Sequence, residues 1–451
     1  MAGIISKPVS GWGRYPVQSC ELTRPERYAE LTPSAERVIV RGQGRSYGDA
    51  SLNAEGRVIL SERLNRMLDF DAGTGLLRAE AGVTLQEVLE VVVSRGWFLP
   101  VTPGTKYASL GGCVAADVHG KNHHDGGGTF SAHVREIELI LADGTRTRCN
   151  AGNNSELFWA TVGGMGLTGI IGEVTLQLML IESARMRVQH CAAPNLEAGF
   201  KLLDGAEFDD TYTVAWIDCL ARGRSLGRSI VMRGHHAALS ELPARDALQP
   251  FARMARRQRR VPFDLPSWAL NPLTVGAFNN LYYWSQGAKQ APFLAGYESY
   301  FYPLDAVADW NRLYGKQGFV QYQCVLPTVG AFEGMRQLLE LLAASRRASF
   351  LAVLKRFGAT GKGMLSFPLP GYTLALDLPV RDAGLFELLD RLDEIVVATG
   401  GRVYLAKDCR LAASTFRAMY PRYGEWLAVK HAVDPGSRFN SSLSRRLRLG
   451  S

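Results

Sequence analysis

The chain has 451 residues, of which 47% are hydrophobic and 21% are charged, a composition typical of a folded protein with two or three domains. Its net charge of +8 favours anionic partners such as phosphate groups, nucleic acid or an acidic membrane surface. No window approaches 18 uninterrupted apolar residues, so no membrane-spanning helix is predicted. Residues 1–16 lack the apolar segment of a signal peptide.

The seven cysteines are scattered and include no Cys-x-x-Cys pair. This pattern favours reduced, mostly buried thiols in a cytoplasmic protein over a disulfide framework or a zinc site. His123 and His124 are adjacent, but no third ligand stands at a suitable spacing, so we expect no metal site.

Residues 41–49 follow a short β-branched strand at residues 38–40 and read RGQGRSYGD. Three glycines within this stretch exclude a helix. They favour a tight loop whose backbone N–H groups turn inward and hold an anion, typically a diphosphate. An ordinary glycine-rich surface turn is the alternative, because isolated glycine patterns are weak evidence.

Strands and a helix follow this first glycine-rich loop. Strands are predicted at residues 58–60 and 76–81. A helix is predicted from Thr84, because Thr84 and Glu87 form a capping box and the apolar residues after it share one helical face. Gly96 ends this helix.

Two further glycine-rich stretches lie at residues 99–128 and 159–171. The small residues at 111–116 let the backbone approach a flat or charged ligand closely. Between the two stretches, an Asp-Gly turn at 142–144 joins two strands into a predicted hairpin. Each glycine-rich loop lies beside a strand, so the three together predict a large ligand that is wrapped by backbone at several points.

Glycine becomes sparse after about residue 185. Alternating strands separated by helix-period segments follow, at residues 212–217, 319–326, 330–344, 373–378 and 383–398. This order favours an α+β domain with an antiparallel sheet. The tail returns to strand, loop and helix, at residues 402–408, 414–419 and 423–433.

Residues 240–295 combine prolines and aromatic residues with a cluster of arginines, and we expect mobile loops here. The cluster has three interpretations: a solvated helix face, a docking site for an anionic membrane surface, or a nucleic-acid site. Nucleic-acid binding is the least favoured, because no nucleic-acid motif accompanies the cluster. Its members are Arg253, Arg256, Arg257, Arg259 and Arg260.

With three such loops in this order, the chain resembles the vanillyl-alcohol-oxidase-type family of flavoproteins, which bind FAD through two glycine-rich loop regions. Four segments are similar to those of family members that oxidise polyprenylphosphoryl-β-D-ribose: HGKNHH at 119–124, FWATVGG at 158–164, AKD at 406–408 and AMYPR at 418–422. HGKNHH and AMYPR are much more specific than the glycine loops, and the similarity covers nearly the whole chain.

The resemblance implies a two-domain α+β fold. Residues 1–184 and 402–451 would form the FAD-binding domain, and residues 185–401 would form an inserted substrate-binding domain with an antiparallel sheet. The composition changes near residues 185 and 402 agree with this division.

The implied reaction is FAD-dependent oxidation of the C2 hydroxyl of polyprenylphosphoryl-β-D-ribose, by hydride transfer to flavin N5. The 2-keto product would pass to a separate NADH-dependent keto-sugar reductase that completes epimerisation to the arabinose form. The resemblance implies no nucleic-acid partner and a cytoplasmic location, and it leaves peripheral contact with the inner face of the membrane open.

The resemblance also assigns site residues. The catalytic residues would be His119, Lys407 and Tyr47, and the substrate-binding residues would be His119, Lys121, Gln323, Lys355 and Ala375. The FAD-binding residues would be Arg41, Gly42, Gln43, Gly44, Arg45, Ser46, Tyr47, Pro103, Gly104, Thr105, Gly111, Gly112, Ala116, Gly120, Asn122, His123, Gly169, Ile171, Tyr404 and Lys407.

The chemistry of three candidates can be weighed directly. Lys407 would stabilise negative charge on the reduced flavin ring, or it is a surface lysine paired with Asp408. His119 would orient the flavin ring, contact the substrate or act as a base. The alternative is a purely structural role for His119. Lys355 stands in an apolar run, where an unpaired charge is costly unless it meets a ligand anion; the alternative is a strand-edge lysine that points outward.

Two departures from relatives are informative. Relatives with covalent flavin carry His in the first loop where this chain has Arg45, so we expect dissociable FAD. Mycobacterial relatives carry Cys in the strand at 373–378 where this chain has Ala375, so thiol-directed inhibitors of that position should have no target. Two other functions stay open from the residues alone: an FAD-dependent oxidase of a soluble sugar, alditol or aldonolactone, and a flavin-free lipid- or nucleic-acid-binding protein.

Overall fold

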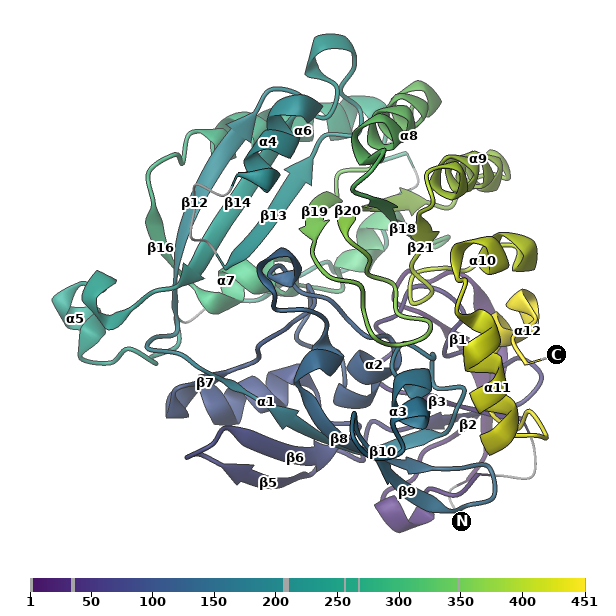
Figure 1. Cartoon of the computed structure of the whole chain (residues 1–451). Helices are drawn as coiled ribbons and strands as arrows, with labels where there is room; N and C mark the ends of the chain where they lie inside the picture. The colour runs from purple at the N-terminus through teal and green to yellow at the C-terminus, as the bar shows by residue number, and fades with distance from the viewer. Residues whose placement is uncertain are drawn as a thin grey trace.

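The structure is a computed structural model that describes residues 3–33, 37–205, 211–254, 257–266, 268–347 and 349–450. Figure 1 shows the N-terminal strands and the C-terminal helices in its lower half, and a large sheet with its helices in its upper half. The site lies between these two parts.

Two sheets form the N-terminal part. The first has the order β1 (Ile5–Ser10), β2 (Val17–Thr23), β4 (Arg57–Leu60) and β3 (Val38–Arg41). In this sheet β4 pairs in parallel with both β2 and β3. The second is antiparallel, with the order β5 (Met67–Asp71), β6 (Leu76–Glu80), β10 (Ile170–Gln177), β8 (Val134–Ile140) and β9 (Arg146–Cys149). The pairing of β8 with β9 confirms the predicted hairpin.

Three helices and a short ribbon complete this part. They are α1 (Leu85–Val92), α2 (Leu110–Ala115), α3 (Ser155–Thr161) and the pair β7 (Trp97–Phe98) and β11 (Met179–Leu180). The capping box of α1 is confirmed, because Thr84 Oγ1 accepts a hydrogen bond from Glu87 N–H and the Glu87 side chain accepts one from Thr84 N–H. The small residues at 110–115 form a helix, which the sequence analysis did not predict.

An eight-stranded antiparallel sheet forms the upper part, as predicted. Its order is β16 (Phe293–Gly296), β12 (Arg185–Ala193), β14 (Ser229–His236), β13 (Tyr212–Ile217), β19 (Ala352–Phe357), β20 (Gly371–Pro379), β18 (Phe319–Pro327) and β21 (Arg402–Val403). The helices that belong to it are α4 (Leu196–Asp204), α7 (Tyr297–Phe301), α8 (Ala331–Ser345) and α9 (Gly384–Ala398).

The two faces of this sheet serve different purposes, because successive side chains of a strand point to opposite faces. On β18, Tyr322 and Cys324 pack in the core with residues of α8 and α9. Their neighbours Gln321 and Gln323 face a cavity on the other side. The core therefore lies under α4, α8 and α9, and the opposite face borders a cavity that residues of α7 also line.

The prediction of loops across residues 240–295 is wrong in part, because this region holds α5 (Ala244–Ala247) and the long helix α6 (Pro272–Gly287). Pro272 looked like a breaker but occupies the first helical turn, behind an Asn271 cap, where proline is favoured. The described arginines of the cluster lie on no helix: Arg259 and Arg260 form β15 (Arg259–Arg260), which pairs in parallel with β17 (Val307–Ala308). Arg256 lies outside the described residues.

The C-terminal segment returns to the N-terminal sheets. Its helices are α10 (Ala413–Met419), α11 (Tyr423–Val433) and α12 (Ser442–Leu447). The backbone of Val38 on β3 exchanges hydrogen bonds with Arg438 and Asn440, and Ser442 N–H donates to the carbonyl oxygen of Leu52. These bonds fix the chain end beside the strand that precedes the first glycine-rich loop.

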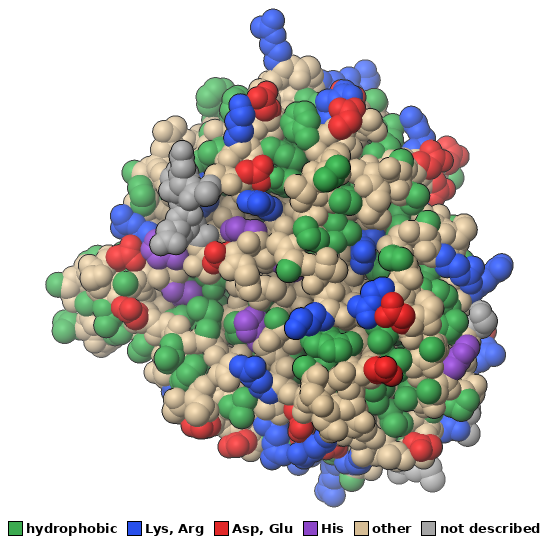
Figure 2. All heavy atoms as spheres, in the orientation of Figure 1, with side chains coloured by type: hydrophobic (Ala, Val, Ile, Leu, Met, Phe, Trp, Pro, Cys, Tyr) green, Lys and Arg blue, Asp and Glu red, His purple; other side chains and the backbone are tan. Residues whose placement is uncertain are grey.

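The surface carries no single dominant patch on the face that Figure 2 shows, where Lys and Arg side chains are dispersed among acidic and hydrophobic ones. None of the helices in the described ranges combines the length and the hydrophobicity that a membrane span requires. All seven cysteines are free thiols.

Candidate active site

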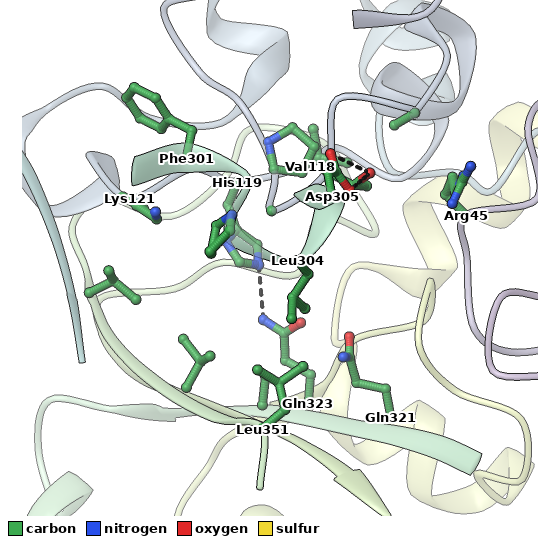
Figure 3. Close-up of a pocket in the computed structure, with 18 of the residues that line it drawn as sticks. Arg45, Val118, His119, Lys121, Phe301, Leu304, Asp305, Gln321, Gln323 and Leu351 are labelled. Atoms are coloured by element: carbon green, nitrogen blue, oxygen red, sulfur yellow. Dashed lines mark hydrogen bonds between the residues drawn. The ribbon is translucent and has the colours of Figure 1, made fainter. Parts of the chain in front are cut away.

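A cavity of about 810 Å³ separates the free face of the eight-stranded sheet from the glycine-rich loops (Figure 3). This volume is toward the upper end of ligand sites in proteins, which span roughly 300–1,000 Å³. Most of the predicted site residues line it: Gly42, Gln43, Gly44, Arg45, Ser46, Tyr47, Pro103, Gly104, Thr105, Gly112, Ala116, His119, Lys121, Gln323, Lys355, Ala375, Tyr404 and Lys407.

The other predicted cofactor residues do not line the cavity: Arg41, Gly111, Gly120, Asn122, His123, Gly169 and Ile171. Several of them hold the loops in place instead. The Arg41 guanidinium donates to Ser10 O at 2.6 Å and to Ser51 Oγ at 3.2 Å.

The second glycine-rich stretch is fixed in a similar way. Asn122 Nδ2 donates to Pro100 O at 2.9 Å, and His123 Nδ1 accepts from Gly358 N–H at 3.1 Å. Of the third stretch, Met165 lines the cavity, whereas Gly169 directly precedes β10 and Ile171 is its second residue.

Arg45 lies between two aromatic rings of the cavity region. Its guanidinium carbon is 4.1 Å from the ring centroid of Trp12 and 4.8 Å from that of Tyr107. Burial lowers the pKa of Arg45, and the nearby Asp305 opposes that effect. The guanidinium stays charged, and its buried Nε has no hydrogen-bond partner among the described residues. A stacked cation with a free donor suits an anionic ligand.

Tyr47 and Lys407 meet where the first loop contacts the segment after β21. Tyr47 N–H donates to Ala406 O at 3.1 Å, and Lys407 Nζ lies 4.0 Å from the Tyr47 ring centroid. Gly48 allows this contact, because a Cβ there would lie 1.6 Å from the carbonyl oxygen of Asp408. Burial lowers the pKa of Lys407 to about 7, opposed by Asp377. An anion beside Lys407 would therefore favour its charged form.

His119 is held by Gln323 (Figure 3). The side-chain amide of Gln323 donates to His119 Nε2 at 2.9 Å, so the proton of the neutral ring is on Nδ1. Burial lowers the pKa of His119 well below its ordinary value, and Lys355 and Lys407 lower it further. A neutral ring whose lone pair is already engaged can orient a ligand, but it has no free site to accept a proton.

Two more lysines, Lys121 and Lys355, line the cavity. Burial lowers the pKa of Lys355 to about 8, and its Nζ lies 3.5 Å from Gly120 O. Lys355 lies on the central strand β19 and faces the cavity, so the alternative of an outward strand-edge lysine is wrong. Lys121 Nζ donates to Tyr300 O and lies 4.4 Å from the Tyr300 ring centroid.

Gln321 and Asp377 also belong to the site, and neither was predicted from the sequence. Gln321 precedes Gln323 by two residues, so it shares the cavity face of β18, and strand alternation could have identified it. Its Nε2 donates to Asp377 Oδ1 at 2.5 Å. Asp377 is fully buried, which raises its pKa to about 7, and Gln321 opposes this rise. No sequence signal pointed to Trp12 or Asp305, which reach the site from distant segments.

A buried ion-pair cluster under the first loop was also missed. Arg446 on α12 donates to both carboxylate oxygens of Asp49, at 3.0 and 2.8 Å, and lies 2.9 Å from Asp408 Oδ2. Asp49 ends the first glycine-rich loop and Asp408 follows Lys407. The C-terminal helix therefore locks together the two segments that carry Tyr47 and Lys407.

The residues around the cavity fit FAD. Residues of the first loop and the second loop line one cavity together with Tyr404, Ala406 and Lys407. Gly104 faces open space, since a Cβ there would meet no atom within 4 Å. Arg45 and Lys407 supply cations, and Arg45 Nε is a buried donor without a partner. Loops of this kind hold diphosphates, and a large apolar sheet face with a few polar groups suits a flat ring system.

Comparisons with known proteins agree with this fit. The FAD binding domain family matches residues 29–150. The decaprenylphosphoryl-beta-D-ribose oxidase of Mycolicibacterium smegmatis is 39% identical over 98% of this chain and 98% of its own. An uncharacterised protein of Streptomyces coelicolor is 38% identical over 81% of this chain and all of its own. An alditol oxidase of a Streptomyces species is 25% identical over 98% of this chain and 99% of its own.

The fold and the site define an FAD-dependent oxidoreductase of the vanillyl-alcohol-oxidase type, which acts on a CH–OH group and has a two-domain α+β fold. The predicted fold class and the predicted cofactor FAD are confirmed. The chain belongs to the decaprenylphosphoryl-β-D-ribose oxidase family.

Proposed function

We propose that this enzyme oxidises the C2 hydroxyl of a polyprenylphosphoryl-β-D-ribose to the 2-keto sugar, the first half of epimerisation to the arabinose form. The observation that carries this proposal is the full-length similarity to decaprenylphosphoryl-beta-D-ribose oxidase, at 39% identity over 98% of both chains. The lower identity of 25% to an alditol oxidase disfavours a soluble alditol substrate.

FAD, when bound, supplies the acceptor for the hydride that leaves C2. We assign the first loop, the second loop and residues 404–407 to its binding, because they line the cavity together. FAD is held without a covalent bond, since the first loop carries Arg45, whose guanidinium is stacked on Trp12 and has no group that attaches to flavin. Denaturation should therefore release the flavin into the supernatant, and flavin that stays with the precipitate would contradict this.

Lys407, Tyr47 and His119 contact the reacting groups in this proposal. Lys407 supplies a fixed cation where negative charge develops, and the Tyr47 ring, 4.0 Å from Nζ, holds that cation in place. His119 orients the ring system and the sugar as a neutral imidazole, because Gln323 already occupies its lone pair. A role of His119 as the base is therefore disfavoured.

Lys121, Lys355 and Gln323 bind the substrate. Burial lowers the pKa of both lysines, and Lys355 lowers that of Lys121 further. A phosphate dianion beside them would favour their charged forms and repay the cost of their burial. Gln323 and Ala375 are paired across β18 and β20, so the small Ala375 side chain leaves room for the sugar beside the Gln323 amide.

The proposal extends to the organisation and partners of the enzyme. Residues 1–184 and 402–451 form the FAD-binding domain, and residues 185–401 form the substrate-binding domain. The bonds that join Val38 to Arg438 and Asn440 support the bipartite first domain. The enzyme works in the cytoplasm, peripherally at the inner face of the membrane, and a separate NADH-dependent reductase consumes its 2-keto product.

Identifying the oxidised carbon tests the proposed reaction. The purified enzyme is incubated with polyprenylphosphoryl-β-D-ribose, the product is reduced with borodeuteride, and the sugar is analysed by mass spectrometry. We expect deuterium at C2 and a mixture of ribose and arabinose. Deuterium at another carbon, or none in the sugar, would contradict the proposal.

A further inference from the structure

Helix α6 forms one wall of the cavity. Phe278, Tyr282 and Gln286 line the cavity from one side of this helix, and Trp216 on β13 packs against Tyr282 with ring centroids 4.7 Å apart. Phe278 is nevertheless 43% exposed. Lys289, just after the helix, is also both exposed and cavity-lining. The cavity therefore opens to the exterior along α6.

The opposite side of α6 is apolar and exposed. Leu273, Leu281 and Trp284 are 84%, 70% and 71% exposed. At 3.6 residues per turn they lie within about 80° of one another around the helix axis, and Ala277 falls between them. They form a continuous stripe about 16 Å long, at a rise of 1.5 Å per residue. We call these four residues the outer stripe.

Helix α6 itself carries no charged side chain, which is unusual for a surface helix. Residues 272–288 contain no Asp, Glu, Lys or Arg, although 21% of the chain is charged, so three or four charges would be expected here. A helix whose outer face is exposed to water usually carries charged residues on that face. Single exposed apolar side chains are common on proteins, but a stripe that includes Trp on an uncharged helix marks an interaction surface.

We propose that the outer stripe of α6 docks on the surface of a lipid bilayer, so that a lipid-linked substrate enters the cavity past Phe278. This inference rests on the proposed function, because a polyprenyl phosphate resides in the bilayer and its chain must pass from lipid to cavity. The inner side of α6 lines the cavity mouth while its outer side would lie among lipid headgroups and acyl chains. Trp and Leu side chains suit that interface.

Vesicle binding by the holoenzyme tests the docking. Unilamellar vesicles of phosphatidylcholine and phosphatidylglycerol are sedimented with the wild-type enzyme and with the double variant Leu281→Ser/Trp284→Ser. We expect the wild type to cosediment and the variant to lose vesicle affinity by at least about tenfold. The matched control is Val329→Ser, which removes an 88% exposed side chain before α8 and should bind as the wild type does.

Activity separates this inference from the proposed function. The double variant should reduce its flavin normally with a short-chain, water-soluble polyprenylphosphoryl ribose, but slowly with a long-chain substrate embedded in vesicles. A wild-type enzyme that is reduced by the short-chain substrate but ignores vesicles overturns the docking alone. An enzyme that binds vesicles through α6 but is reduced by neither substrate overturns the proposed function alone. If size-exclusion chromatography shows that the double variant only breaks a dimer, with vesicle binding unchanged, the stripe is a contact between copies and the docking is overturned.

Discussion

The buried cluster of Arg446, Asp49 and Asp408 gives the sharpest test of how the site is held together. Replacing Arg446 by Met keeps most of the side-chain volume but removes the cation. Asp49 then loses both hydrogen bonds that it accepts from Arg446, at 3.0 and 2.8 Å. Asp408 loses the ion pair at Oδ2, but its Oδ1 still accepts from the backbone N–H groups of Arg410 and Leu411. The larger part of the cost therefore falls on Asp49, which is only 4% exposed.

The size of this cost follows from burial and pH. Removing one partner of a buried ion pair typically costs about 3–5 kcal/mol. Protonation of Asp49 sets an upper limit on the stability that the variant loses. Neutralising a carboxyl with a pKa near 3.9 costs about 1.36 kcal/mol for each pH unit above that pKa, or about 4 kcal/mol at pH 7. Burial already raises the pKa of Asp49 in the wild type, and Arg446 opposes that rise. Without Arg446 the folded-state pKa of Asp49 rises further above its unfolded value, so the variant loses more stability as pH increases. The limit therefore shrinks to about 1.5 kcal/mol at pH 5.

Urea unfolding at pH 7 and pH 5 measures this cost. We expect Arg446→Met to lose about 3–4 kcal/mol at pH 7 and less than half of that at pH 5. The control Lys201→Met breaks an exposed ion pair with Glu197 on α4 and should leave the urea midpoint close to that of the wild type. The double variant Arg446→Met/Asp49→Asn should recover part of the loss. A loss below 1 kcal/mol, or one that is equal at the two pH values, would refute this reasoning.

Three further outcomes are expected at the cavity wall. Gln323→Leu removes the donor to His119 Nε2 and should slow anaerobic flavin reduction on the order of 10²-fold with unchanged flavin content; a rate within threefold of the wild type would contradict the role of the Gln323 amide. Ala375→Cys places a thiol in the cavity and should add one site for thiol reagents that bound substrate protects; an unchanged labelling count would show that position 375 is inaccessible. Burial lowers the pKa of Lys407 to about 7. Burying the charged form destabilises the folded apoprotein fully below pH 7, and this loss of stability disappears above the unfolded pKa of about 10.4. The apoprotein should therefore gain stability in urea between pH 7 and pH 10, and Lys407→Met should lose that part of the gain; parallel curves for the two proteins would contradict the assignment.

Local signals in the sequence predicted much of the fold. The capping box of Thr84 and Glu87 and the Asp-Gly hairpin turn depend on neighbouring residues only, so both could be read directly. The strand at 212–217 matches β13 (Tyr212–Ile217), because its residues suit a buried strand. Helix α6 was missed, because its two apolar sides give no helical periodicity and Pro272 suggested a loop.

The site was predictable to the extent that its residues lie in distinctive segments. The glycine-rich loops and the segment at 404–407 line the cavity as expected. Asp377 lies two residues after Ala375 on β20, so strand alternation could have identified it. Trp12 and Arg446 were not predicted, because their places depend on contacts between segments hundreds of residues apart, such as the bond between Arg446 and Asp49. Their residue types alone are ordinary on strands, loops and helix ends.

Anaerobic mixing of the purified holoenzyme with polyprenylphosphoryl-β-D-ribose measures the proposed oxidation itself. We expect this compound to bleach the yellow flavin absorbance, whereas its 2-deoxy analogue and free alditols should not. An unbleached flavin with the ribosyl lipid, or equally fast bleaching by the 2-deoxy analogue or a free alditol, would contradict it.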